Sequence, residues 1–497
     1  MPALISLLSG SLIPLGFSPF NFWPVLMLAL AVAFLVNRNN SPKKALINGF
    51  LFGMGMFGTG TSWIYVSIHQ FGSAPIPLAA LLTVLFVACM SILFIAPCFW
   101  LYSWITHRRT ITAPWRQALT FSALWVIFEW IRSWLLTGFP WLFAGYSLLD
   151  THFSGWAPLV GTYGLSFLSV TSSCIIATII ISKGSRRLAP ALVSLVLATL
   201  WIASLPLSKT QWTTPTGTMS FSAIQGNIPQ SLKWDPDYIQ NTLSTYLELT
   251  NNEWNQDLII WPENAIPLLY SQARGFIQQL EQVAKRQGTS LITGLPIDRQ
   301  TSAYPLYYNG VISLGQGHGQ YFKQKLVPFG EYVPLESLLR GLIAFFNLPM
   351  SSFSAGSSDQ TPLMAGNIAI TPYICYEVVY PDFAAKMARN SGLLITISND
   401  TWFGKSIGPE QHFQMARMRA LETGRYLIRD TNDGITALID DSGKIIETIP
   451  RFEKGVLRGT ATVMKGNTPF MVTGSWPVMA LCLLLLGLCC INIGNRE

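Results

Sequence analysis

Ile368-Ala-Ile-Thr-Pro-Tyr-Ile-Cys375-Tyr376-Glu377 is the stretch around which the soluble part of this chain is organised. It is predicted to form a short buried strand that ends in a cysteine and is followed by a turn at residues 379–382. A lone thiol at a strand end is a candidate nucleophile, although a free cysteine is more commonly a buried core residue. Between residues 208 and 466 Cys375 is the only cysteine, and the others lie in long apolar runs: Cys89, Cys98, Cys174, Cys482, Cys489 and Cys490.

The composition indicates a multi-pass membrane protein that carries one soluble domain. Of the 497 residues, 50% are hydrophobic and only 11% are charged, whereas soluble proteins carry about 25% charged residues. We expect three parts: an N-terminal membrane domain with seven transmembrane helices over residues 1–208, a soluble domain over 209–468, and a C-terminal transmembrane helix with a short tail over 469–497. The sequence contains no zinc-ligand spacing, phosphate-binding loop or dinucleotide fingerprint, so no metal or cofactor is expected.

The loops between the predicted spans alternate in charge. Two spans are predicted within residues 1–37, two within 45–107 with a break near residues 69–75, and one each near 118–136, 156–182, 188–207 and 476–493. Since basic loops stay in the cytoplasm, both termini are predicted to be cytoplasmic and the soluble domain to lie on the outer side. The pI near 9.0 therefore reflects loops beside a membrane and not a nucleic-acid-binding surface. Three of the six loops among the first seven spans hold nine basic residues, and the other three hold none: Arg38, Lys43, Lys44, Arg108, Arg109, Arg116, Lys183, Arg186 and Arg187.

The fifth predicted span contains two charged side chains, Glu129 and Arg132. Residues at i and i+3 share a helix face, so these two side chains can pair with each other. Charges inside a membrane segment also mark functional sites or lipid-headgroup contacts. We favour a mutually neutralised structural pair.

Strands and helices alternate along residues 209–468. Short, continuously apolar strands separated by helices are typical of an α/β sandwich whose sheets are covered by helices, and 260 residues can bury a full core. The predicted strands cover residues 219–225, 258–261, 290–295, 307–314, 320–326, 368–375, 393–398, 426–429, 435–439 and 456–461. The predicted helices cover residues 236–250, 272–287, 383–390 and 410–422.

The thiol of Cys375 needs a base to act as a nucleophile. Histidine is the usual partner, but His318 lies in a glycine-rich turn and His412 lies on a helix, so neither follows a buried strand. Glu263 directly follows the apolar strand at residues 258–261, at the end where α/β sheets place their active sites. A carboxylate there can accept a proton near neutral pH.

Two further charged residues complete the candidate site. Lys323 closes a short strand, and its amine could stabilise a developing oxyanion and favour the thiolate. Glu331 lies in a loop flanked by two prolines. Each residue alone could be an ordinary surface charge. Complementary groups at three strand ends nevertheless favour a catalytic site.

These motifs resemble the Glu-Lys-Cys signatures of the nitrilase superfamily. With the eight-span layout, the whole chain is similar to the apolipoprotein N-acyltransferase family of the bacterial inner membrane. One common nitrilase feature differs, because the histidine often found two residues after the lysine is Lys325 here. The matching stretches are Trp261-Pro-Glu263, Tyr321-Phe-Lys323-Gln-Lys-Leu-Val-Pro-Phe-Gly-Glu331, Ile374-Cys375-Tyr-Glu377, Gly16-Phe-Ser-Pro-Phe-Asn-Phe-Trp-Pro24, Glu129-Trp-Ile-Arg132, Thr137-Gly-Phe-Pro-Trp141, Gly226-Asn-Ile-Pro-Gln-Ser-Leu-Lys-Trp234 and Ser398-Asn-Asp-Thr-Trp-Phe-Gly404.

The resemblance implies a nitrilase-like αββα sandwich in the periplasm and a two-step acyl transfer without a cofactor. Glu263 would take the proton of Cys375, whose thiolate attacks the sn-1 ester of a phospholipid, typically phosphatidylethanolamine. Lys323 and the backbone N–H of Tyr376 would hold the oxyanion. The resulting thioester would then acylate the α-amine of the diacylglyceryl cysteine at the N-terminus of an apolipoprotein. The chain is expected to act as a monomer.

Other residues receive supporting roles from the resemblance. Glu331 would position Lys323 or assist proton transfer, and Glu377 would support the neighbouring nucleophile. Trp234, Tyr376 and Trp402 would line or gate the acyl path, although large aromatic residues are about equally expected in a core.

Two alternatives use the same sequence features. A membrane-tethered amidase could hydrolyse a small amide with the same three residues, although it would not need eight spans. A transporter or lipid-handling scaffold would only bind ligands, but no inverted repeat is visible and only one span carries charges.

Overall fold

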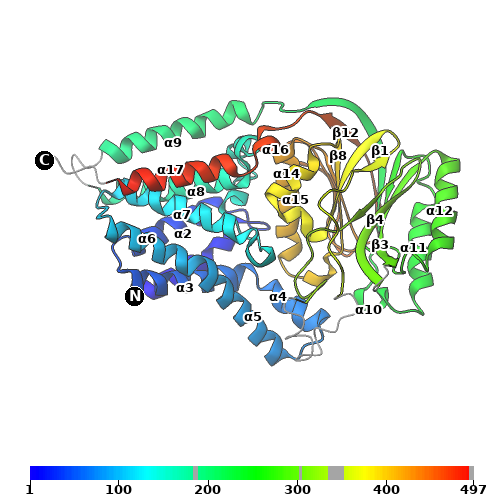
Figure 1. The fold of residues 1–497 in the computed structure, drawn as a ribbon, viewed down its shortest axis with the longest axis horizontal. Coiled ribbons are helices and arrows are strands. Elements are labelled where there is room, and N and C mark those ends of the chain that lie inside the picture. The colour runs from blue at the N-terminus through cyan, green and yellow to red at the C-terminus, as the bar shows by residue number, and fades with distance from the viewer. Residues whose placement is uncertain (183–187, 301–304, 334–351, 492–497) are drawn as a thin grey trace.

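The computed structural model describes residues 1–182, 188–300, 305–333 and 352–491 of the chain. A helical bundle forms one half of the molecule and an α/β domain forms the other (Figure 1). The chain enters the α/β domain after helix α9 and returns to the bundle through helix α17, so the domain is tied to the bundle at both ends. The predicted basic loop at residues 183–187 lies outside the described residues.

Helices occupy each of the eight segments predicted to span a membrane. The segments 76–108, 152–181 and 190–207 are long and apolar enough to cross a bilayer, whereas α1, α2 and α17 are shorter apolar helices. The number of helices that cross the membrane stays a prediction. The bundle helices are α1 (Pro2–Leu12), α2 (Trp23–Asn37), α3 (Pro42–Gly60), α5 (Ile76–Met90), α6 (Ala96–Arg108), α7 (Pro114–Arg132), α8 (Ala157–Ile181), α9 (Leu188–Leu207) and α17 (Trp476–Cys490).

The break predicted between the third and fourth spans contains a short helical segment. Helix α3 ends at Gly60, α4 (Trp63–Val66) and the π-helical turn η2 (Ser67–Phe71) follow, and α5 begins at Ile76. This segment reaches from the bundle to the α/β domain, because the hydroxyl of Ser67 donates to the carbonyl oxygen of Trp402 at 2.7 Å.

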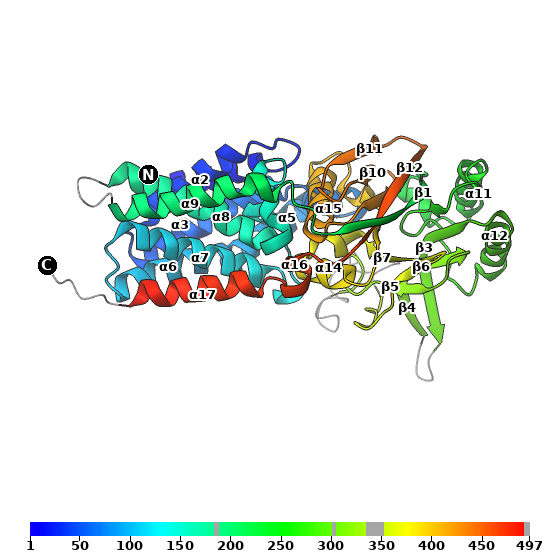
Figure 2. The same ribbon diagram turned by 90° about the horizontal axis from the view of Figure 1, so that it is seen from above.

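The described basic loops meet at the end of the bundle that lies away from the α/β domain (Figure 2). Nε of Arg38, after α2, donates to Oε1 of Gln117 on α7 at 2.6 Å. Nη2 of Arg116 donates to the carbonyl oxygen of Ile491, just past α17, at 2.6 Å. The loop between α2 and α3, the start of α7 and the end of α17 are therefore neighbours.

The predicted ion pair between Glu129 and Arg132 does not form. Oε1 of Glu129 instead accepts from Nε1 of Trp125 and from the backbone N–H of Ala144, both at 2.8 Å. The Arg132 guanidinium lies over two aromatic rings, 5.1 Å from the Phe57 centroid and 5.0 Å from that of Phe143. The prediction was wrong because Glu129 is used to hold the backbone that follows α7.

The α/β domain contains two six-stranded sheets within the described residues. Their strand orders are β12-β1-β2-β3-β4-β5 and β11-β10-β9-β8-β7-β6. In each sheet the central strands run parallel and the outer pairs run antiparallel. The strands are β1 (Thr214–Gln225), β2 (Leu258–Ile260), β3 (Ser290–Gln300), β4 (Pro305–Gly315), β5 (Gln320–Phe322), β6 (Leu363–Ala365), β7 (Ile368–Ile374), β8 (Leu393–Ser398), β9 (Leu427–Thr431), β10 (Thr436–Ile439), β11 (Ile445–Ile449) and β12 (Gly455–Lys465).

Alternate side chains of each strand enter different cores, as the two-residue period of a strand requires. Leu258 and Ile260 of β2 face the second sheet, whereas Ile259 packs under the outer helices α11 (Ile239–Thr250) and α12 (Arg274–Gln287). The outer face of the second sheet is covered by α14 (Pro381–Ala388) and α15 (Gly408–Thr423). These four layers confirm the predicted αββα sandwich.

Two strands and a short helix were not predicted, and several boundaries differ. The edge strand β11 is exposed along most of its length and shows no alternation, while β6 has only three residues. Both depend on pairing with neighbouring strands rather than on local pattern. The four-residue helix α10 (Gln230–Lys233) was also missed, and β5 ends at Phe322 rather than at residue 326.

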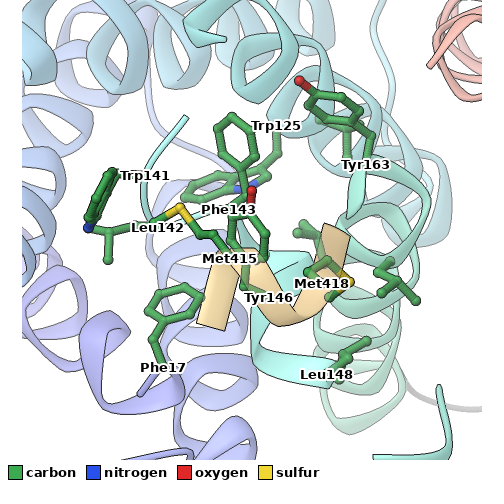
Figure 3. Packing of buried hydrophobic residues seen from close by; sticks show 14 of the residues in the cluster. Phe17, Trp125, Trp141, Leu142, Phe143, Tyr146, Leu148, Tyr163, Met415 and Met418 are labelled. Carbon is green, nitrogen blue, oxygen red and sulfur yellow. The ribbon is translucent and has the colours of Figure 1, made fainter. Parts of the chain in front are cut away.

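Helix α15 is buried between the second sheet and the helical bundle. Met415 and Met418 of α15 pack among Phe143, Tyr146 and Leu148 from the loop after α7 (Figure 3). The same cluster includes residues from the bundle helices and from the outer face of the second sheet. The two halves of the molecule therefore share one continuous hydrophobic core.

A buried ion pair on α15 is hydrogen-bonded to the bundle. Glu422 of α15 pairs with Nε of Arg419 at 3.0 Å and accepts from the backbone N–H and hydroxyl of Thr162 on α8 at 2.7 and 2.6 Å. Glu422→Ala should lower the free energy of unfolding by about 3–5 kcal/mol, because it leaves the buried Arg419 charge unpaired. Denaturant titration in detergent tests this.

Asp150→Ala is the matched control for that experiment. Asp150 pairs with Arg417 across the same interface, but its side chain is 42% exposed. Removal of such a pair should cost less than about 1 kcal/mol. Equal losses in the two variants would contradict the assignment of Glu422 as a buried link.

Candidate active site

The two sheets place the candidate catalytic residues at their ends. Glu263 follows β2, Lys323 directly follows β5 and Cys375 directly follows β7. Glu263 and Lys323 come from the first sheet and Cys375 from the second, so the site lies where the ends of the two sheets face each other. Glu263 and Lys323 are only 5% and 1% exposed, which keeps these two side chains away from bulk water.

Lys323 is held between two carboxylates. Its Nζ lies 2.9 Å from Oε1 of Glu331 and 3.6 Å from Oε1 of Glu263. Burial alone would lower the pKa of Lys323, but the two carboxylates outweigh it and hold the pKa above its usual range. The ammonium therefore keeps its proton at neutral pH and can stabilise negative charge that develops beside it.

Asn309 of β4 fixes the spacing of the two carboxylates. Its Nδ2 donates to Oε1 of Glu263 and to Oε1 of Glu331, each at 2.7 Å. The backbone N–H of Asn399 donates to the other Glu263 oxygen at 2.9 Å. Sequence reasoning missed Asn309, although a lone amide in a buried apolar strand was a usable signal.

Lys233 was also missed. Its Nζ donates to the carbonyl oxygen of Glu263 at 2.9 Å. Burial lowers the pKa of Lys233 to about 8, although the nearby Glu263, Asp433 and Cys375 oppose this shift. Lys233 thereby ties the backbone of Glu263 to α10.

Cys375 adopts a left-handed backbone conformation, with φ of +51°. This conformation costs an L-residue roughly 1–2 kcal/mol, so the surrounding contacts must hold it. Burial raises the pKa of the Cys375 thiol to about 12, and the Glu263 carboxylate adds to the rise while Lys323 opposes it. The thiol is therefore protonated at rest and close enough to both groups to sense their charges.

Glu377 supports the strand end that precedes Cys375. Its side chain is fully buried and accepts from the backbone N–H of Ile374 at 2.9 Å, the backbone N–H of Gln324 at 2.7 Å and the hydroxyl of Tyr321 at 2.8 Å. Burial raises the pKa of Glu377 to about 7, against the effect of these hydrogen bonds. Glu377 thus ties the segment after β5 to the segment after β7.

The predicted aromatic residues lie at different places. Tyr376 donates from its hydroxyl to the carbonyl oxygen of Gly138 in the bundle at 3.1 Å. Trp402 packs edge-on against Phe71 at a centroid distance of 5.9 Å. Trp234 is half-buried at the end of α10, next to Lys233. Tyr376 and Trp402 therefore contact the membrane domain, and the acyl-path role of all three residues stays a prediction.

No group of histidine, cysteine, aspartate or glutamate side chains that could hold a metal ion occurs among the described residues.

Comparison with known proteins identifies the family. Residues 9–175 match the apolipoprotein N-acyltransferase N-terminal domain, and residues 221–464 match the carbon-nitrogen hydrolase family. An apolipoprotein N-acyltransferase of Pseudomonas syringae pv. tomato is 47% identical over 97% of this chain and 95% of its own length. The chain belongs to the apolipoprotein N-acyltransferase family. Relatives of the same name in Pseudomonas aeruginosa and Coxiella burnetii are 48% and 40% identical, over 97% and 98% of this chain and 94% and 99% of theirs.

This membership rests on both halves of the chain, because the similarity extends over nearly its full length. The membrane domain is part of the match, so neither a tethered amidase nor a binding scaffold is favoured. The chain is an acyltransferase enzyme with a nitrilase-type domain.

Glu263→Gln should lower the pKa of Cys375, because it removes a negative charge beside the thiol and keeps the shape of the side chain at position 263. At a given pH between 8 and 10, iodoacetamide should therefore alkylate Cys375 faster. Peptide-level mass spectrometry across this pH range measures the rate at Cys375 separately from the other cysteines. Glu281→Gln, a substitution at an exposed position on α12, is the control. An unchanged pKa of Cys375 in Glu263→Gln would contradict the placement of Glu263 beside the thiol.

Proposed function

We propose that this chain transfers an acyl chain from the sn-1 position of a phospholipid, typically phosphatidylethanolamine, to the α-amine of the N-terminal diacylglyceryl cysteine of apolipoproteins. The observation that carries the proposal is the grouping of Glu263, Lys323 and Cys375 in a chain similar over its full length to apolipoprotein N-acyltransferases. The transfer proceeds through a thioester on Cys375.

In the first step, Glu263 accepts the proton of Cys375 as the sulfur attacks the ester carbonyl. A resting thiol with a pKa of about 12 makes this assistance necessary, because little thiolate is present at neutral pH. The negative charge that develops on the carbonyl oxygen is met by Lys323 and the backbone N–H of Tyr376. The C–O bond then breaks, and protonated Glu263 gives its proton to the departing lysophospholipid alkoxide.

In the second step, the acceptor amine attacks the thioester carbonyl. The same oxyanion donors stabilise the tetrahedral intermediate, and Glu263 accepts a proton from the amine. The C–S bond then breaks, the amide is released, and protonated Glu263 returns its proton to the Cys375 thiolate. Glu331 holds Lys323 at 2.9 Å throughout and so keeps the ammonium aimed at the reacting carbonyl.

The location of the site suits two substrates that reside in a membrane. We place the α/β domain in the periplasm and both termini in the cytoplasm. The meeting of the described basic loops at the far end of the bundle supports this orientation. We assign Trp402, Tyr376 and Trp234 to the path of the acyl chain toward Cys375; the contacts of Tyr376 and Trp402 with the bundle support this assignment.

Incubation of the purified chain with phosphatidylethanolamine in detergent should add one acyl chain to Cys375. Intact mass and peptide mapping detect the adduct, and hydroxylamine should remove it because a thioester, unlike an amide, is cleaved under mild conditions. Addition of a peptide with an N-terminal diacylglyceryl cysteine should discharge the adduct onto the peptide.

Cys375→Ala should form no adduct, and Cys89→Ala, a change at an exposed cysteine of the bundle, should form it at the wild-type rate. An adduct that maps elsewhere, or none at all in the folded wild-type chain, would overturn the proposed function.

A further inference from the structure

The carbonyl group of Cys375 has a partner that the mechanism does not use. Nε2 of His412, on α15, lies 3.2 Å from the backbone oxygen of Cys375. A carbonyl oxygen only accepts hydrogen bonds, so the ring must carry a proton on Nε2 and donate it. His412 therefore restrains the peptide unit between Cys375 and Tyr376, which presents the N–H of Tyr376.

The other side of the His412 ring is fixed by a buried chain of charged groups. With its proton on Nε2, the ring accepts at Nδ1 from Nη2 of Arg429 at 3.1 Å. The same Nη2 donates to Oδ2 of Asp400 at 2.5 Å, and Oδ1 of that carboxylate lies 3.1 Å from Nδ1. The hydroxyl of Ser398 also donates to Asp400 at 2.9 Å. All of these side chains are at most 2% exposed, so the ring has little freedom to rotate away from Cys375.

The charges in this cluster keep His412 neutral. Burial and the neighbouring Arg429 lower the pKa of His412, and together they outweigh the opposite effect of Asp400. Burial raises the pKa of Asp400, but Arg429 and His412 outweigh it and leave the pKa below its usual range. A neutral ring donates to Cys375 without placing a second positive charge beside Lys323.

The membrane domain covers the face of the same ring. Trp141 stacks on His412 at a centroid distance of 6.1 Å and on Tyr376 at 6.5 Å. Its Nε1 donates to Oε1 of Gln411, the residue before His412, at 2.6 Å. Trp141 is fully buried. The loop after α7 therefore packs against both His412 and Tyr376 through this one indole ring.

We propose that His412 is a positioning residue for Cys375. By holding the carbonyl oxygen of Cys375, His412 orients the Cys375 thiol and the N–H of Tyr376 toward the same substrate carbonyl. This inference rests on the proposed function, since it assumes that Cys375 forms the thioester. The hydrogen bond from Nε2, and not the mere bulk of the ring, is the required feature.

Two substitutions separate the hydrogen bond from the ring. His412→Gln keeps an N–H donor at nearly the position of Nε2 but loses the aromatic ring, whereas His412→Phe keeps a ring under Trp141 but has no donor. The readout is the single-turnover rate of Cys375 acylation at several phosphatidylethanolamine concentrations. We expect His412→Phe to reduce the maximal rate by about 100-fold, with little change in the half-saturating lipid concentration, because small misplacements of reacting groups have effects of this size. His412→Gln should retain most of the rate.

A wild-type rate in His412→Phe, or a loss in His412→Gln as large as that in His412→Phe, would overturn the positioning role. If His412→Phe does not fold, His412→Met provides a second donor-free side chain that adapts to the site, and the same outcomes apply. Absence of an acyl adduct in the wild type would instead overturn the proposed function, so the two failures are distinguishable.

Discussion

The buried ammonium of Lys323 between Glu263 and Glu331 is the contact on which the site depends. A lysine that is 1% exposed can stay charged only where carboxylates compensate for lost hydration. Burial and the Glu263 carboxylate raise the pKa of the Cys375 thiol and so keep it protonated, although Lys323 opposes this shift. In the proposed mechanism, this arrangement supplies a positive charge for the oxyanion and a base for the thiol.

The second constraint is the backbone of Cys375. Its left-handed conformation is costly and must be held by surrounding contacts. Glu377 holds the strand end before it, and His412 meets its carbonyl oxygen. Tyr376, directly after it, is tied to the loop that follows α7. The nucleophile is thus fixed by the second sheet, by α15 and by the membrane domain together.

Much of this organisation could be predicted from the sequence. The apolar runs and charged loops identified the bundle segments, and motifs at strand ends identified Glu263, Lys323 and Cys375. Asn309, Lys233 and His412 were not assigned roles, because their partners lie on elements distant in sequence and only packing of the sheets brings them together. The Glu129–Arg132 pairing failed for the same reason: spacing along one helix could not reveal that Ala144 and Trp125 use the carboxylate.

The shared hydrophobic core couples the helical bundle to α15 and to the residues that follow Cys375. In the proposed reaction an acyl thioester must survive until an amine arrives, so water has to be kept from its carbonyl. Trp141 and Tyr376 are both buried, and they stack between the loop after α7 and the residues around Cys375. If the bundle only anchored the domain, a flexible linker would suffice. Because the apolar core is continuous, the geometry at Cys375 depends on the position of the bundle. In the proposed function the bundle lies in the membrane that holds both substrates, so the site is fixed relative to that membrane.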